Sequence, residues 1–164
     1  MSSTQISLIP TVSEDLELIL AIETSPQNAP YIGQWKRNQH EAAIFDTNIA
    51  HLKIVLDDKI IGYVILIGID NPDRSIQLKR IVVRQKGYGF GRQTIRLIKE
   101  MVFSKLQAHR LWLDVMIHNT RAYNLYLSEG FVEEGILRES LKQGENFIDL
   151  KVMSILESEY RSIE

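Results

Sequence analysis

The sequence predicts a mixed α+β fold built around one β-sheet. Short aliphatic and β-branched runs alternate with segments of helical periodicity, and turn-forming residues separate them. Along the chain the predicted order is βα, then βββ, then αβ and finally αββ. No repeat, low-complexity tract or linker divides the 164 residues, so we expect residues 1–164 to form a single domain.

The N-terminal third begins with a strand and a helix. Gln5–Pro10 is a short apolar run that ends at a proline, as edge strands often do. The following "TVSEDLELILAIE" offers Thr11 or Ser13 as an N-cap, with acidic residues in the first turn. Residues 24–48 mix prolines, a glycine and polar residues, which predicts a loop containing one or two short helices.

Three strands are predicted in the middle of the chain. Residues 51–73 read as a hairpin, because two apolar runs flank Asp57-Asp58 and a turn signal ends the second run. The next run, "SIQLKRIVVRQ", alternates between apolar and polar residues. The alternation slips by one residue near Lys79-Arg80, which predicts a β-bulge.

The C-terminal half supplies two helices and three strands. In "RQTIRLIKEMVFSKLQ" the apolar residues recur at helical spacing, and Arg96, Lys99 and Lys105 are expected to point outward. "RLWLDVMIH" is the next strand, followed by the helix "TRAYNLYLSE", which ends at Gly130. The chain then closes with two strands around a turn at Gln143-Gly144.

Composition narrows the class of protein. A formal net charge of −2 gives no support for a nucleic-acid partner. The chain has no cysteine, which excludes thiolate catalysis and is compatible with the cytoplasmic location that we expect. No signal peptide and no membrane span are predicted. His40, His51 and His109 lack metal-ligand spacing, so no metal site is predicted.

Three glycines stand between the best strand and the best helix, in "KGYGFGR". The N-terminus of a helix leaves backbone N–H groups unpaired and carries a partial positive charge, so it can bind a phosphate group. Glycines let the backbone approach the anion closely. The segment does not contain the Walker sequence G-x-x-x-x-G-K-[ST] or a complete dinucleotide fingerprint. The segment is therefore predicted to bind a phosphorylated cofactor other than a Walker-type nucleotide or a dinucleotide. The alternative is that it only connects the strand to the helix and binds no ligand.

The pattern [Q/R/K]-x-x-G-x-[G/A], here Lys86, Gly89 and Gly91, resembles the pyrophosphate loop of the GNAT-superfamily N-acetyltransferases. Downstream, N-x-R-A, L-Y-x-x-x-G-F and "EG" in "HNTRAYNLYLSEGFVEEG" are similar to the same superfamily. The resemblance is dense from Gln77 to Met153. It implies a mostly antiparallel central sheet of about six or seven strands with about four flanking helices. It also implies a splayed strand pair that binds acetyl-CoA, used as a co-substrate without a metal.

The resemblance assigns roles to individual residues. Backbone groups of Ile81, Val82 and Val83 would pair with the pantetheine arm of the cofactor, and the Val83 N–H would bind the thioester oxygen. Asn119 would also bind the arm, and Tyr126 would act as the general acid. The remaining predicted cofactor-binding residues belong to the glycine segment: Lys86, Gly87, Tyr88, Gly89, Phe90, Gly91 and Arg92.

The general base is not identified by the resemblance. Related enzymes often place a glutamate on the strand before the glycine loop, but this sequence has Gln77 there. Asp114, Glu134 or a chain of water molecules could serve instead.

The acceptor side is expected to be formed by the first helix and the loop after it. That segment holds several acids and two aromatic residues: Glu14, Asp15, Glu17, Glu23, Tyr31 and Trp35. The C-terminal half resembles ribosomal-protein alanine and polyamine N-acetyltransferases. The sequence therefore predicts acetyl transfer to a primary amine of a small molecule, a polyamine or a peptide N-terminus, by a monomer or homodimer. A non-catalytic acyl-CoA-binding domain is the alternative, and a nucleotide-binding domain is a more distant one.

Overall fold

The computed structural model describes residues 5–163. Seven strands form one mixed, mostly antiparallel sheet in the order β1-β2-β3-β4-β5-β7-β6, and only the β4–β5 pair is parallel. The strands are β1 Ser7–Pro10, β2 Ile49–Leu56, β3 Lys59–Ile67, β4 Ser75–Val83, β5 Arg110–Met116, β6 Val132–Gln143 and β7 Asn146–Leu156. The α-helices are α1 Leu16–Thr24, α2 Arg37–Phe45, α3 Phe90–Glu100, α4 Thr120–Ser128 and α5 Glu157–Ile163.

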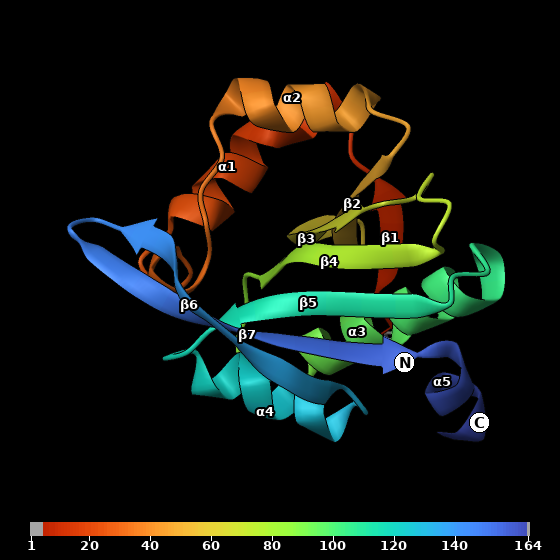
Figure 1. The fold of residues 1–164 in the computed structure, drawn as a ribbon. Coiled ribbons are helices and arrows are strands. Elements are labelled where there is room, and N and C mark those ends of the chain that lie inside the picture. The colour runs from red at the N-terminus through yellow and green to blue at the C-terminus, as the bar shows by residue number, and fades with distance from the viewer. Residues whose placement is uncertain (1–4, 164) are drawn as a thin grey trace.

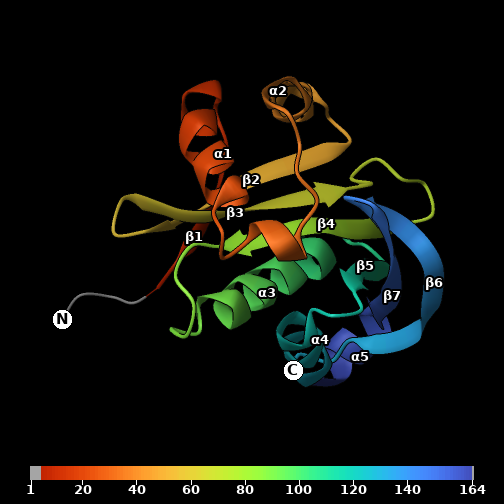
Figure 2. The ribbon, with the colours of Figure 1, turned by 90° about the vertical axis from the view of Figure 1, so that its left-hand side faces the viewer.

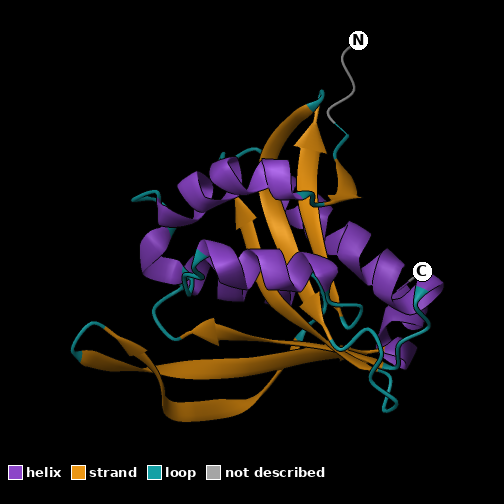
Figure 3. Cartoon of the chain, turned by 90° about the horizontal axis from the view of Figure 1, so that it is seen from above, coloured by secondary structure: helices purple, strands orange, loops and turns teal. Residues whose placement is uncertain are grey.

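The helices cover the two faces of the sheet separately. Helices α1 and α2 lie above the strands β1 to β4, and α3 and α4 lie below the sheet (Figure 1; Figure 2). Seen from above, helices overlie the strands (Figure 3). Each face has its own buried apolar cluster. Leu16, Ile19 and Ile22 of α1 pack on one face, and Ile95 and Ile98 of α3 belong to the larger cluster on the other.

Local turn chemistry sets the first hairpin. Asp57 and Asp58 connect β2 to β3, and both adopt a positive φ, of 49° and 64°. A two-residue connection of this kind matches the twist of the flanking strands, and aspartate tolerates it better than most residues. The hairpin predicted from the sequence is confirmed.

A bulge interrupts β4 where the sequence pattern slips. Arg80 pairs with Ile65 of β3, whereas Leu78 pairs with Leu66, so Lys79 stands outside the ladder. Strand β4 then diverges from β5, because the two are paired only along Ser75–Gln77. The splayed strand pair that the resemblance implied is therefore present, and within residues 5–163 no strand pairs with β4 beyond Gln77 on that side.

Two details of the C-terminal half differ from the prediction. Lys99 is not turned outward: it is 6% exposed, and its Nζ donates to the Glu129 carbonyl at 2.8 Å. A long aliphatic stem lets lysine lie in an apolar contact while its ammonium finds an acceptor. Helix α5 was not predicted, and it follows β7 directly. No helix among the described residues is long and apolar enough to cross a membrane.

Candidate active site

A cavity of about 1080 Å³ opens where β4 and β5 separate. It is lined by the second half of β4, the glycine loop, the start of α3, the end of β5 and one side of α4. The loop between α1 and α2 and the β6–β7 hairpin close it on the remaining side. All the predicted cofactor-binding residues line the cavity except Tyr88, whose ring is 70% exposed and stacks on Phe90.

The end of β4 presents part of its backbone to the cavity. The Arg84 N–H donates to the Ile61 carbonyl of β3, and the Val82 carbonyl lies against Gly62 of the same strand. The described residues contain no cis peptide, so the C=O and N–H of each peptide point in opposite directions. The N–H of Val83 therefore points away from β3, toward the side on which β5 has diverged.

The glycine loop ends in the exposed amides of α3. Gly87 and Gly89 have φ of 86° and 77°, a region that a side chain would strain. The first backbone bond of the helix runs from the Gln93 N–H to the Gly89 carbonyl. The amides of residues 89–92 therefore precede the helical ladder and are available to an anion.

Two cations at this end have fixed positions. The Lys86 Nζ donates to the Val83 carbonyl at 2.8 Å and to Asn28 Oδ1 at 2.7 Å. Burial, and then the nearby charge of Arg121, lowers the pKa of Lys86. Arg92 donates to Ser128 Oγ at 2.9 Å, which holds it beside α4. Two cations therefore lie in the same lining as the exposed amides, where they would strengthen the binding of a pyrophosphate.

Helix α4 supplies Tyr126 and is capped by Asn119. Tyr126 is 7% exposed, lines the cavity, and packs against Phe131. Burial, and then the charge of Asp114, raises the pKa of Tyr126, so the phenol keeps its proton at neutral pH. Asn119 uses its Oδ1 to accept from the Ala122 N–H at 3.3 Å, so it is an N-cap and also lines the cavity.

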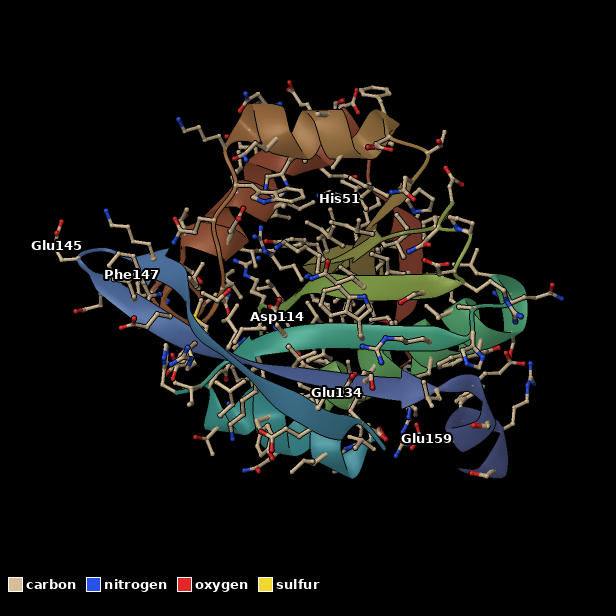
Figure 4. All side chains as sticks on the ribbon, viewed as in Figure 1. His51, Asp114, Glu134, Glu145, Phe147 and Glu159 are labelled. Carbon is tan, nitrogen blue, oxygen red and sulfur yellow. The ribbon has the colours of Figure 1, made fainter. Side chains whose placement is uncertain are left out.

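The two carboxylates that were considered as bases lie in different places. Asp114 of β5 lines the cavity, while Glu134 of β6 lies on the other side of β5 (Figure 4). Glu134 forms an ion pair with Arg110 at 2.6 Å, and its pKa is lowered by hydrogen bonds from Ser154 and Arg110. Burial raises the pKa of Asp114, against a smaller lowering by Lys79. Asp114 is thus the carboxylate that has access to the cavity.

The side of the cavity on which the acceptor is expected is closed by the α1–α2 loop, which contacts two other segments. The Pro30 carbonyl accepts from His118 Nε2 at 3.2 Å and from Gln143 Nε2 at 3.1 Å. The Tyr31 ring lies 5.8 Å from the His118 ring, centre to centre. These contacts connect the α1–α2 loop to the end of β5 and to the hairpin, and together they form one wall.

A buried polar network, which sequence reasoning missed, supports this wall. Glu23 of α1 is fully buried and accepts from Arg80 Nη1 at 2.8 Å and from the Trp35 N–H at 2.7 Å. His40 Nε2 lies 2.7 Å from the other oxygen of Glu23, and His40 Nδ1 lies 3.0 Å from His51 Nε2. The network joins α1, α2, β2 and β4 at the level of the bulge.

Two of the acids in the segment that was expected to form the acceptor side do not face the cavity. The carboxylates of Glu23 and Asp15 are paired within the protein, with Arg80 and Lys53, and neither residue lines the cavity. A signal for Glu23 was present in the sequence, because it lies seven residues after Leu16 and four after Ile19, on the buried stripe of α1.

A splayed strand pair, a glycine loop that leads into exposed helix amides, and a buried tyrosine in one cavity are the arrangement expected of an acyltransferase. The model of the "Acetyltransferase (GNAT) family" matches residues 16–131, more than half of the chain. The chain therefore belongs to this family. The predictions of the family, of its fold and of an acetyl-CoA-dependent N-acetyltransferase are confirmed.

Particular relatives are spermidine acetyltransferases. Spermidine N(1)-acetyltransferase of Vibrio cholerae serotype O1 is 36% identical over 115 residues, which is 68% of this chain and 66%, just under two thirds, of that protein. A crystal structure of the Vibrio cholerae spermidine N-acetyltransferase with CoA and spermine is 28% identical, with a TM-score of 0.86. It covers 97% of this chain and 99% of its own. Another structure of the Vibrio cholerae enzyme, with manganese ions, is 26% identical, with a TM-score of 0.82 over 98% of this chain and 97% of its own. Among residues 5–163 no group of histidine and acidic side chains is arranged to hold a metal ion.

Proposed function

We propose that this chain transfers the acetyl group of acetyl-CoA to the primary amine of a small molecule by direct attack on the thioester. One observation carries the proposal: three kinds of group line the same cavity. They are the Val83 N–H, which points away from β3, the exposed amides at the start of α3, and the buried side chain of Tyr126. These groups correspond to the thioester oxygen, the pyrophosphate and the leaving sulfur of the cofactor.

Main-chain groups bind and orient the cofactor. The pantetheine arm lies along the open edge of β4 and pairs with Ile81 and Val83 as an added strand would. The pyrophosphate lies on the amides of residues 89–92. The Val83 N–H donates to the thioester oxygen, whose negative charge grows as the amine attacks, and a contact of this kind contributes about 3 kcal/mol in other acyl transfers.

Tyr126 protonates the leaving thiolate. The amine nitrogen forms a bond to the carbonyl carbon, and the C–S bond then breaks with its electron pair on sulfur. As the amide forms, the nitrogen loses its second proton, which replaces the proton that Tyr126 gives to the sulfur. A phenol whose pKa is raised by burial remains protonated, so a proton is always available for the sulfur. Transfer of this proton prevents the thiolate from attacking the new amide.

Asp114 takes the proton of the acceptor ammonium. An alkylamine has a pKa of about 10.4 and is mostly protonated at neutral pH, so a base is needed before it can attack. Asp114 lines the cavity, its pKa is raised by burial, and its charge acts on Tyr126. A raised pKa makes the carboxylate a better proton acceptor.

The acceptor class is supported by the relatives rather than by a bound molecule. Those relatives acetylate spermidine by name, which makes polyamines one class to test, and peptide N-termini are another. A cytoplasmic location, as the composition predicts, fits an enzyme that uses acetyl-CoA.

Release of the CoA thiol from acetyl-CoA, measured against a panel of amines, tests the proposal. We expect thiol release that depends on an amine and yields one acetylated product per thiol. Asp114→Asn should lower kcat about a hundredfold for an alkylamine, and less for an α-amine of pKa about 8, which is more often neutral. Glu134→Gln is the matched control. Equal losses for both variants, or for both amines, would remove Asp114 from this role.

A further inference from the structure

The charges that line the cavity are strongly unequal. Of the described residues that line it, Asp114 alone carries a carboxylate. The cations that line it are Lys79, Arg80, Lys86, Arg92 and Arg121. A CoA molecule brings several phosphate charges, so an excess of cations is expected, but only where the phosphates lie.

The cations fall into two groups along the cavity. Lys86 and Arg92 belong to the glycine loop and the start of α3, and Arg121 lies in the first turn of α4. Lys79 and Arg80 are instead on β4, before the backbone groups that bind the thioester. The charge of Lys79 lowers the pKa of Asp114, and the charge of Asp114 raises the pKa of Tyr126. Lys79 therefore belongs to the end of the cavity that holds the proposed base and acid.

The two β4 cations differ in how they are balanced. The Arg80 guanidinium forms a buried ion pair with Glu23, stacks at 5.1 Å from the Trp35 ring, and lies against Gly33. Lys79 is exposed to the cavity, because the bulge removes it from the ladder. The charge of Lys79 acts on Asp114, and Asp114 is the carboxylate that must receive the proton of the reacting amine.

We propose that Lys79 selects the acceptor by charge, so that the acetylated amine belongs to a molecule whose remaining part is neutral or anionic. The inference rests on the proposed function. A second ammonium group on the acceptor meets Lys79 and finds no further carboxylate in the lining, whereas a carboxylate or a neutral chain does not meet this repulsion. Spermidine, whose remaining part is cationic, is disfavoured by this arrangement, although relatives use it.

Three acceptors share a five-carbon chain with a primary amine at one end and differ in the charge at the other end. They are 5-aminopentanoate, which is anionic there, pentylamine, which is neutral, and 1,5-diaminopentane, which is cationic. Each presents the same kind of primary amine to the thioester, and spermidine is measured beside them. The wild type, Lys79→Glu and the neutral control Lys79→Gln are compared by kcat/KM for each acceptor. Ratios between acceptors are taken within one variant, so that any effect on Asp114 or on folding cancels.

For the wild type we expect kcat/KM for 1,5-diaminopentane and spermidine to be at least about tenfold below that for 5-aminopentanoate. Lys79→Glu should reverse this order, chiefly through KM for the acceptor, and Lys79→Gln should make the ratio nearly one. Wild-type preference for the diamine or spermidine, or ratios unchanged in Lys79→Glu, would overturn the charge selection while leaving amine acetylation in place. Absence of acetylation for every amine would overturn the proposed function and this inference together.

Discussion

Glu23 and Arg80 lie 57 residues apart in the sequence, and their carboxylate and guanidinium meet at 2.8 Å in the interior. The pair fastens α1 to the bulge of β4, and both side chains are almost fully buried. Removing one partner of a buried pair leaves the other charge without compensation, which typically costs 3–5 kcal/mol, so about that range is expected here.

Glu23→Gln should therefore lower the free energy of unfolding by about 3 kcal/mol, as measured by urea denaturation. Glu17→Gln, at an exposed position of the same helix, is the matched control and should change it by less than about 0.5 kcal/mol. Similar stabilities for the two variants would show that the pair does not hold the helix to the sheet.

His51 should make stability depend on pH. Burial, followed by the charges of His40 and Arg80, lowers the pKa of His51 to about 4, while Asp15 opposes this weakly. An unfolded histidine has a pKa of about 6.5, so between these values the unfolded chain binds more protons and unfolding is favoured as pH falls. Stability from this group is complete above pH 6.5 and declines by up to about 3 kcal/mol toward pH 4.

The contribution of His51 can be separated from those of the carboxylates by comparison with His51→Gln. The difference in unfolding free energy between wild type and variant should fall as pH is lowered from 6.5 to 4. Parallel curves for the two proteins would mean that His51 titrates in the folded state as it does in the unfolded chain.

Tyr126→Phe should lower kcat about a hundredfold, because a positioned general acid contributes on that scale. KM for acetyl-CoA should change little, since the main chain binds the cofactor. Tyr123→Phe, on the same helix, is the control: its ring packs at 4.0 Å under the Lys151 ammonium instead of lining the cavity. Full turnover by Tyr126→Phe would leave the thiolate to be protonated by solvent.

Gly89→Ala should weaken cofactor binding more than it weakens folding. A Cβ at Gly89 meets no protein atom within 4 Å, so its cost to folding is the strained positive φ, about 1–2 kcal/mol. The same Cβ would stand beside the amides offered to the pyrophosphate. Gly144→Ala is a close control, because Gly144 also has a positive φ and open space but lies in the β6–β7 turn.

Thermal-shift titrations with acetyl-CoA measure both effects in one experiment. Without ligand, the two alanine variants should melt at similar temperatures. With ligand, the shift should be reduced in Gly89→Ala and retained in Gly144→Ala. A full shift in Gly89→Ala would place the pyrophosphate elsewhere.

Features encoded by neighbouring residues could be predicted from the sequence. Three features depend on a few consecutive residues each: the Asp57-Asp58 turn, the bulge at Lys79 and the glycine loop. In each, the residue types are those that the local backbone conformation needs. The residues proposed for the cofactor end could be gathered from the sequence for the same reason, since most of them lie in one strand-loop-helix segment, and the structure places all of them except Tyr88 around one cavity.

The acceptor wall could not be predicted in this way, because it is assembled from distant segments. Pro30, His118 and Gln143 meet only through tertiary packing. The acids of α1 and its flanking residues were considered for binding an amine, yet Glu23, near the end of the helix, is used to balance Arg80 inside the fold. The helical spacing marks Glu23 as buried, but its partner Arg80 lies 57 residues away and leaves no local pattern.

The short stretch of pairing between β4 and β5 has a consequence for the local stability of the sheet. Along β4, only Ser75–Gln77 pair with β5, and just before the strand the Arg74 carbonyl accepts from the N–H groups of His109 and Arg110. A cofactor bound along the open edge of β4, as proposed above, would add hydrogen bonds to the part of the strand that β5 leaves unpaired. Occupancy by acetyl-CoA should then slow hydrogen exchange in the second half of β4 more than in Ser75–Gln77, which are already paired.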